Sequence, residues 1–200
     1  MSDTAKATRT IPLFPLNTVL FPEGPLPLRI FEPRYLDMVS DCLRHDTGIG
    51  IILIEEGSET GPTTQTHQVG TLCHISYWNR RSDGLLGVTM TGDQRFRVLR
   101  QEVCDRHWLV GEVEMLPNEP AQSLPEEFIP LAELLERIIG QLDPPFTTMK
   151  KRLQDACWVG ARLTELLPLD LRRKQSLLEL DNPLQRLAVL NESLHELEMG

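Results

Sequence analysis

The sequence lacks the features that membrane insertion, export or a nucleic-acid partner would require. Its longest apolar stretch, residues 48–54, is about seven residues, whereas a membrane-spanning helix needs about 20. The first ten residues, MSDTAKATRT, are polar and contain no apolar signal core. Basic residues number 20 against 29 acidic ones, so the net charge is −9 and phosphate would meet an unfavourable field. We therefore expect a cytoplasmic protein without a membrane partner, and the charge balance disfavours nucleic acid as a partner.

Cysteine is also scarce, and its spacing forms no metal-binding motif. The four cysteines are Cys42, Cys73, Cys104 and Cys157, and no C-x-x-C pair occurs. Scattered cysteines without an export signal predict free thiols in a reducing compartment. Cys42 and His45 could share an ion on one helix face, but zinc requires three or four ligands. The sequence therefore predicts no metal and no cofactor.

Known catalytic motifs are absent from the 200 residues. The chain has four lysines, none of which belongs to a phosphate-binding G-x-x-x-x-G-K-[ST] loop. G-x-S-x-G, S-x-x-K and H-E-x-x-H are missing as well. A Cys–His catalytic pair remains an alternative, because such residues meet only in space. We expect a protein that is not an enzyme and has no catalytic residues.

The pattern up to about residue 117 alternates with a period of two, as strands do. Extended runs are predicted at residues 11–16, 26–31, 48–55, 69–78, 86–91, 95–98 and 109–115, with turns at 82–84 and at Gly92-Asp93. The alternation places Tyr77 on the same face as Val69 and Cys73. One helix is predicted from Pro33 to His45, with Leu36, Val39 and Leu43 as its apolar stripe. These elements indicate a curled sheet or barrel with one helix at its side.

Beyond residue 117 the pattern becomes helical. A proline-punctuated stretch, PNEPAQSLP, predicts a linker at 118–125 between a β-rich part (10–117) and a helical part (126–198). Apolar residues then recur at helical spacing in segments 128–142, 149–167, 170–180 and from 182 onward. Asp170 and Asn182-Pro183 are typical helix starts. The sequence thus predicts an α+β chain that ends in a small helical bundle.

Three stretches carry a resemblance to a known family. Residues 11–35, IPLFPLNTVLFPEGPLPLRIFEPRY, resemble the opening of the substrate-recognition N-terminal domain of Lon protease. GDQRFRV (92–98) and the helical stretch 158–187 are similar to later parts of that domain. The resemblance implies a PUA-like β pseudo-barrel followed by a helical bundle. It also implies a stand-alone substrate-recognition module without Lon's ATPase and protease domains.

The same resemblance implies partners. Lon-type recognition would make the chain a non-enzymatic binding protein for unfolded or apolar polypeptide segments, as an adaptor or quality-control factor. Two alternatives stay open. One is a PUA-like RNA-binding protein, for which the short basic clusters at 80–81, 150–152 and 172–174 are the candidate contacts. The other is an unrecognised hydrolase or an accessory subunit of ATP-dependent proteolysis.

Candidate partner-binding residues lie in the F-E-P-R-Y block and in the R-F segment. In one interpretation, Arg29, Glu32, Arg34 and Tyr35 line a groove for a partner peptide. In the other, Glu32 lies at a helix start, an arginine pairs with it, and Tyr35 packs on the sheet. Arg95 is a further candidate, and alternation predicts that it points outward into solvent while Phe96 enters the core.

Overall fold

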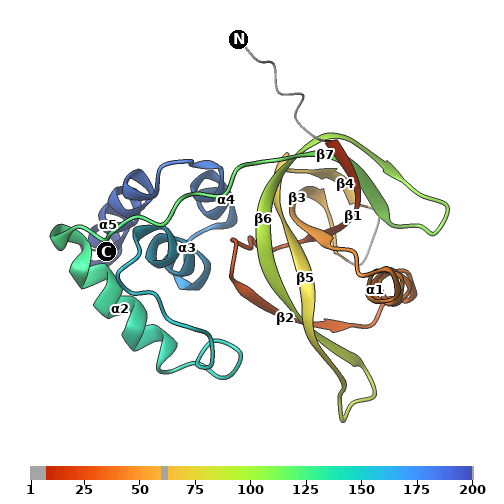
Figure 1. Ribbon diagram of the computed structural model, residues 1–200, viewed down its shortest axis with the longest axis horizontal. Coiled ribbons are helices and arrows are strands. Elements are labelled where there is room, and N and C mark those ends of the chain that lie inside the picture. The colour runs from red at the N-terminus through yellow and green to blue at the C-terminus, as the bar shows by residue number, and fades with distance from the viewer. Residues whose placement is uncertain (1–7, 60–62, 200) are drawn as a thin grey trace. The chain divides into compact units, whose positions relative to one another are not determined.

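The computed structural model describes residues 8–59 and 63–199. These residues form two compact units that divide between Pro117 and Asn118 (Figure 1). Unit 1 comprises the strands and one helix, and unit 2 the remaining helices. The chain is therefore α+β. No helix in the described part of the chain is long and apolar enough to cross a membrane.

Unit 1 consists of seven strands and one α-helix within the described residues. Their order along the chain is β1 (Thr8–Leu16), β2 (Pro25–Ile30), α1 (Pro33–His45), β3 (Ile49–Gly57), β4 (Thr63–Thr66), β5 (Val69–Arg80), β6 (Leu86–Val103) and β7 (Leu109–Met115). The strand β4 was not predicted. Its register with β3 is irregular, which fits a short strand of four residues.

Five of these strands close into a ring. Pairing runs β1–β7–β6–β5–β3, and β3 returns to β1 through the one parallel pair among otherwise antiparallel ones. The strand β2 extends the sheet from β6, and β4 extends it from β3. A closed ring leaves few unpaired strand edges, and the free edge of β2 is one of them.

The interior of the ring is filled by a small apolar cluster with Phe96 and Leu13 at its centre, both fully buried. Glycines make room for them. A Cβ atom at Gly50 would lie 2.8 Å from both side chains, and one at Gly70 would lie 2.6 Å from Phe96 Cζ. Such distances are shorter than normal contacts between carbon atoms, so a side chain at either position would force its neighbours to shift.

Helix α1 covers a second, larger apolar cluster on the outer face of the strands. It begins and ends where the sequence predicts, with Pro33 in its first turn and Asp46 in a left-handed conformation after its end. Its buried residues are Tyr35, Met38, Val39 and Cys42. The predicted stripe was therefore partly wrong, since Leu43 is 43% exposed.

Two strand predictions need correction. The predicted turn at Gly92-Asp93 is wrong, because β6 runs unbroken for 18 residues through both positions. Gly92 is needed instead for a close approach: a Cβ atom there would lie 2.2 Å from the carbonyl oxygen of Phe21. The prediction that Tyr77 lies on the same buried face as Val69 and Cys73 is also wrong. A register shift between Ile75 and Tyr77 changes the alternation, and Tyr77 is 59% exposed.

Unit 2 contains η1 (Glu126–Phe128), α2 (Ile129–Ile139), α3 (Ala156–Leu166), α4 (Leu171–Glu179) and α5 (Pro183–Met199) within the described residues. Helix α3 packs against α2, α4 and α5. It begins at Ala156 rather than near Met149, because the backbone before it bonds elsewhere. Leu124 donates its N–H to Gln154 O, and Ala156 donates to Gln122 O. The Asp155 side chain then accepts the N–H of Cys157 and caps the helix.

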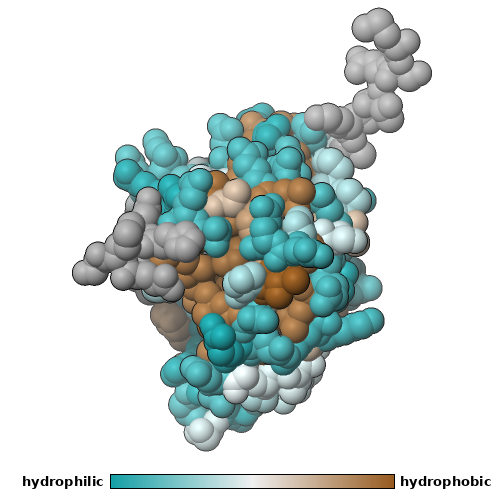
Figure 2. Space-filling model, turned by 90° about the vertical axis from the view of Figure 1, so that its left-hand side faces the viewer, coloured by the Kyte–Doolittle hydropathy of each residue, from teal (hydrophilic) through white to brown (hydrophobic). Residues whose placement is uncertain are grey.

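Apolar side chains also reach the surface of unit 2. Figure 2 looks toward its helices and shows apolar side chains gathered in the middle of that face, surrounded by hydrophilic ones. Among the described residues of this unit, Ile129 and Leu171 are large apolar side chains that remain 45% and 36% exposed. Unit 2 therefore does not bury all of its apolar surface.

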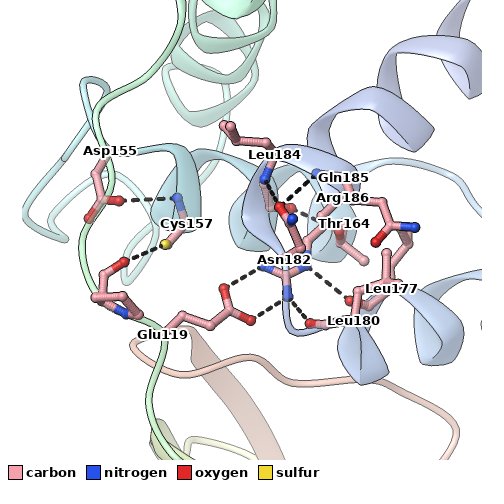
Figure 3. Close-up of polar contacts among 12 residues, drawn as sticks. Glu119, Asp155, Cys157, Thr164, Leu177, Leu180, Asn182, Leu184, Gln185 and Arg186 are labelled. Carbon is pink, nitrogen blue, oxygen red and sulfur yellow. Dashed lines mark hydrogen bonds and ion pairs between the residues drawn. The ribbon is translucent and has the colours of Figure 1, made fainter.

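Arg186 links three segments of unit 2 (Figure 3). Its side chain is 1% exposed and donates to both carboxylate oxygens of Glu119, at 2.8 and 2.5 Å. It also donates to the carbonyl oxygens of Leu177 and Leu180, at 3.0 and 2.6 Å. The segment 118–125, predicted as a linker, is thus bonded to the helices that follow it.

Candidate functional site

The start of α1 brings the charged residues of the F-E-P-R-Y block together. Glu32 has an extended backbone and precedes Pro33, so the helix begins directly after it. Arg34 Nε donates to Glu32 Oε2 at 2.8 Å, and its Nη2 donates to the carbonyl oxygen of Glu59 at 3.3 Å. The structure therefore shows which arginine pairs with Glu32. The bond from Arg34 to Glu59 ties the helix start to the segment that follows β3.

Tyr35 packs inward. It is 4% exposed, and its ring lies 4.1 Å from the ring of Phe14 at an angle of 27°. The guanidinium of Arg34 covers it at 4.5 Å. Burial raises the pKa of the Tyr35 hydroxyl, and the charge of Arg34 opposes this in part. The structural interpretation of Tyr35 is confirmed, and its phenol is neutral at physiological pH.

A hollow of about 80 Å³ opens beside Tyr35. Most of its wall is apolar and comes from the end of β1, the end of β2 and the first turn of α1: Phe14, Leu16, Leu28, Ile30, Phe31 and Tyr35. Arg29, Glu32 and Glu59 supply charge at the same wall.

The rim of this hollow is exposed on one side. Phe31 is 57% exposed, although it directly follows the buried Ile30. Arg29 is exposed as well, and it makes no hydrogen bond or ion pair with any residue in the described part of the chain. An apolar hollow with an exposed phenylalanine and an open cation is suited to holding a side chain from another molecule.

Sequence reasoning found only one side of this hollow. Arg29, Glu32 and Tyr35 line it, and Arg34 contacts two of its lining residues. Phe14, Leu16 and Glu59 were missed, because they come from other segments and join the site only through folding. Alternation could have revealed Phe31, since a buried Ile30 in an extended run predicts an outward neighbour.

Arg95 does not behave as expected. Its side chain is 3% exposed, and it lies opposite the fully buried Thr71 in the register of β5 and β6. The prediction that it points into solvent is wrong. Alternation fails here because both faces of this part of the sheet are covered, as the burial of Phe96 beside it shows. Arg95 does not line the hollow.

Residues 10–196 match a protein-family model described as the ATP-dependent protease La (LON) substrate-binding domain. The match covers nearly the whole sequence. The chain belongs to the LON substrate-binding domain family.

Solved structures of this family agree in fold. A Lon N-terminal domain protein from Xanthomonas campestris is 38% identical, with a TM-score of 0.75 over 92% of this chain and 98% of that one. The N-terminal domain of a Mycobacterium avium complex Lon protease has a TM-score of 0.62 over 92% of this chain and 97% of that one. Its identity is 15%, so it supports the fold alone.

Curated relatives of this LON-family chain are longer. Lon protease 2 from Herpetosiphon aurantiacus is 27% identical over 98% of the chain. Lon protease from Anaeromyxobacter dehalogenans is 25% identical over 86% of it. The chain spans about a quarter of each protease, 25% and 24%. The residues that match the LON substrate-binding domain make up nearly all of this chain.

The described residues of this LON-family chain contain no group of three or more Cys, His, Asp or Glu that could hold a metal ion. His45 Nδ1 lies 2.9 Å from the carbonyl oxygen of Asp41 on its own helix, while Cys42 is buried. Burial raises the pKa of the Cys42 and Cys73 thiols, and that of Cys157 to about 11. These three thiols are protonated at neutral pH, and a protonated thiol is a poor nucleophile.

Proposed function

We propose that the chain is a non-enzymatic binding module for exposed apolar segments of unfolded polypeptide. The observation that carries this proposal is the hollow beside Tyr35, which is apolar, open and rimmed by the exposed Phe31. Membership of the LON substrate-binding domain family supports protein as the class of ligand. Arg29, Glu32, Arg34 and Tyr35 form or support the site, whereas the burial of Arg95 removes it from the contact surface.

The proposal extends to fold and role. The closed strand ring of unit 1 supports a PUA-like pseudo-barrel, and the packing of α3 against three other helices supports a helical bundle. An adaptor or quality-control role follows if the bound segments are those that folded proteins bury. Four free cysteines support a reducing, cytoplasmic location.

Binding should be weak, and its apolar part should be insensitive to salt. Burial of apolar surface contributes about 25 cal/mol per Å², so ~300 Å² of contact supplies ~7 kcal/mol before ordering costs. Ordering a flexible segment costs several kcal/mol, which leaves dissociation constants near micromolar to millimolar. Salt does not screen apolar burial, whereas it weakens phosphate binding steeply.

The test compares two exposed apolar residues of unit 1. Phe31→Ser removes the rim of the hollow, and Leu99→Ser removes a side chain of similar exposure, 52%, that does not line it. Titration with a fluorescently labelled, permanently unfolded protein should show at least about five-fold weaker binding for Phe31→Ser, as for an interface hot spot. Leu99→Ser should bind as the wild type does. Equal effects of the two substitutions would contradict the assignment of the site.

One observation favours the RNA alternative. Tyr77 and Trp78 are both 59% exposed and lie close in sequence to Arg80 and Arg81 near the end of β5. Exposed aromatic rings beside cations are suited to stacking with bases. The same titrations with a labelled single-stranded RNA, at low and high salt, separate the two functions. RNA binding that disappears at high salt, with no binding of unfolded protein, would favour the alternative.

A further inference from the structure

Arg29 differs from the other charged groups around the hollow because it has no partner there. Glu32 accepts from Arg34 at 2.8 Å, and the Glu59 carboxylate accepts the N–H of Asn17 at 2.5 Å. Arg29 makes no hydrogen bond or ion pair within the residues that the structure describes. The site therefore presents a guanidinium without a hydrogen-bonded or ion-paired partner, in an apolar wall that also carries the carboxylates of Glu32 and Glu59.

Asp83 is the acidic residue that senses the charge of Arg29. Its carboxylate is already bonded to the N–H of Leu85 at 3.0 Å and to Arg81 Nε at 3.1 Å. These two bonds lower the pKa of Asp83 more than Arg29 does. Asp83 thus leaves the guanidinium of Arg29 available to a ligand.

The free edge of β2 is poorly suited to pairing with a ligand as an additional strand, because it has few N–H donors. Within the described residues β2 pairs only with β6, and Gly92 donates its N–H to Gly24 O. The N–H and C=O groups of successive strand residues point to opposite sides. Because those of Gly24 point toward β6, the groups of residues 26, 28 and 30 also point toward β6, and those of 25, 27 and 29 point away from it. Pro25 and Pro27 have no N–H, so Arg29 supplies the one donor of this edge. An added strand would therefore find three carbonyl acceptors but only one of three N–H donors on this edge, so main-chain pairing there is weakened.

On the basis of the proposed function, we infer that the hollow binds an apolar residue of a segment in which an acidic residue lies within two positions of it. Both residues are held through their side chains. The apolar group enters the hollow between Leu28 and Tyr35, and the carboxylate pairs with Arg29. Neighbouring residues of an extended segment lie about 3.3 Å apart along the chain, which the long side chain of Arg29 can span. The occupant is thus an unfolded segment that combines apolar and acidic residues.

The test uses three labelled peptides of equal length with one leucine, followed by Asp, Asn or Lys. An exposed ion pair contributes little, so the wild type should bind the Asp peptide about two- to five-fold more tightly than the Asn peptide at low salt. The Lys peptide should bind more weakly still. High salt should reduce these differences, because it screens charge and leaves apolar binding intact.

Variants assign the effect to Arg29. Arg29→Gln should abolish the preference for Asp, and Arg29→Glu should reverse it in favour of Lys. Arg97→Gln is the matched control, since Arg97 is an exposed arginine of β6 that does not line the hollow. A Leu-Asp peptide with N-methylated backbone amides should bind as its parent does.

The outcomes separate this inference from the proposed function. A preference for Asp that survives Arg29→Gln, or equal binding of all three peptides, overturns the role of Arg29. Loss of binding on N-methylation overturns recognition through side chains. A peptide with serine in place of leucine that binds equally well overturns the proposed function itself.

Discussion

The two units bury polar groups to different extents. Unit 1 fills its interior with apolar side chains, and Thr71 and Arg95 are its fully buried polar residues among those described. The smaller unit 2 buries Arg162, Thr164, Gln175, Arg186 and Ser193. A buried cation is stable only while its partners are in place. The comparison teaches that buried polar groups, two of them arginines in ion pairs, contribute more to the interior of unit 2 than to that of unit 1.

The largest effect should come from Glu119→Gln in unit 2. The substitution removes the carboxylate that binds both terminal nitrogens of Arg186 and leaves a buried charge without its counter-ion. Breaking such a pair costs about 3–5 kcal/mol. Hydrogen exchange measured by mass spectrometry should show amide protection falling at least about a hundredfold in unit 2 and unchanged protection in unit 1.

Glu133→Gln, at an exposed position of α2, is the control and should change neither unit. Equal loss of protection in both units would contradict the comparison, because it would mean that they unfold as one. Proteolysis within 118–125 should accelerate in Glu119→Gln alone, since this segment is fastened through Arg186.

The two units can also be compared through the rate at which a cysteine in each reacts with an alkylating reagent. Burial, with the charges of Glu119 and Asp155, raises the pKa of Cys157 from 9.0 to about 11. A rise of two units lowers the thiolate fraction at pH 8 about a hundredfold. Alkylation of Cys157 should be slower than that of a short cysteine peptide by this factor, measured by mass spectrometry. Cys73, fully buried in unit 1, should react only on unfolding.

The raised pKa of Cys157 also predicts how the stability of unit 2 changes at alkaline pH. The unfolded chain releases the Cys157 proton near pH 9, while the folded chain retains it until about pH 11. Rising pH therefore favours the unfolded state between these values, and unit 2 should lose stability there. If Cys157 were alkylated as fast as the cysteine peptide, the claim that its thiol is protected by a raised pKa would be wrong.

The smallest of these effects, about 1–3 kcal/mol, should follow Gly70→Ala in unit 1. The added methyl group would lie 2.4 Å from the carbonyl oxygen of Ile51 and 2.6 Å from Phe96 Cζ, so the ring of strands must distort. Gly140→Ala in unit 2 is the contrast. Its Cβ would meet nothing closer than 3.4 Å, and its φ of −64° suits alanine. Urea denaturation should show Gly70→Ala destabilised and Gly140→Ala neutral or slightly stabilised, and the opposite order would refute the role of shape in unit 1.

Local signals allowed much of the fold to be predicted. The helix α1 has the predicted bounds because Pro33 and the residues after His45 mark its ends within the sequence itself. The strand β6 was divided in error, because Gly92 serves a contact with Phe21, about 70 residues away. The late start of α3 likewise depends on bonds with Gln122 and Leu124.

The candidate site shows the same limit. The block from Arg29 to Tyr35 is continuous in sequence and could be singled out from it. Phe14, Leu16 and Glu59 join that block only after β1 and β3 pair, so no local pattern marks them. The burial of Arg95 was missed because period-two alternation assumes one solvated face.

The closure of the strand ring has a consequence for synthesis of the protein. The strand β1 leaves the ribosome before β7, yet the two pair, and Leu13 lies opposite Leu109. At roughly 5–20 residues per second, these partners emerge several seconds apart. During that interval Ile11 and Leu13 have no interior to enter, since the ring does not exist before its last strand. A nascent chain of this protein thus exposes an apolar segment of the kind that we propose it binds once folded.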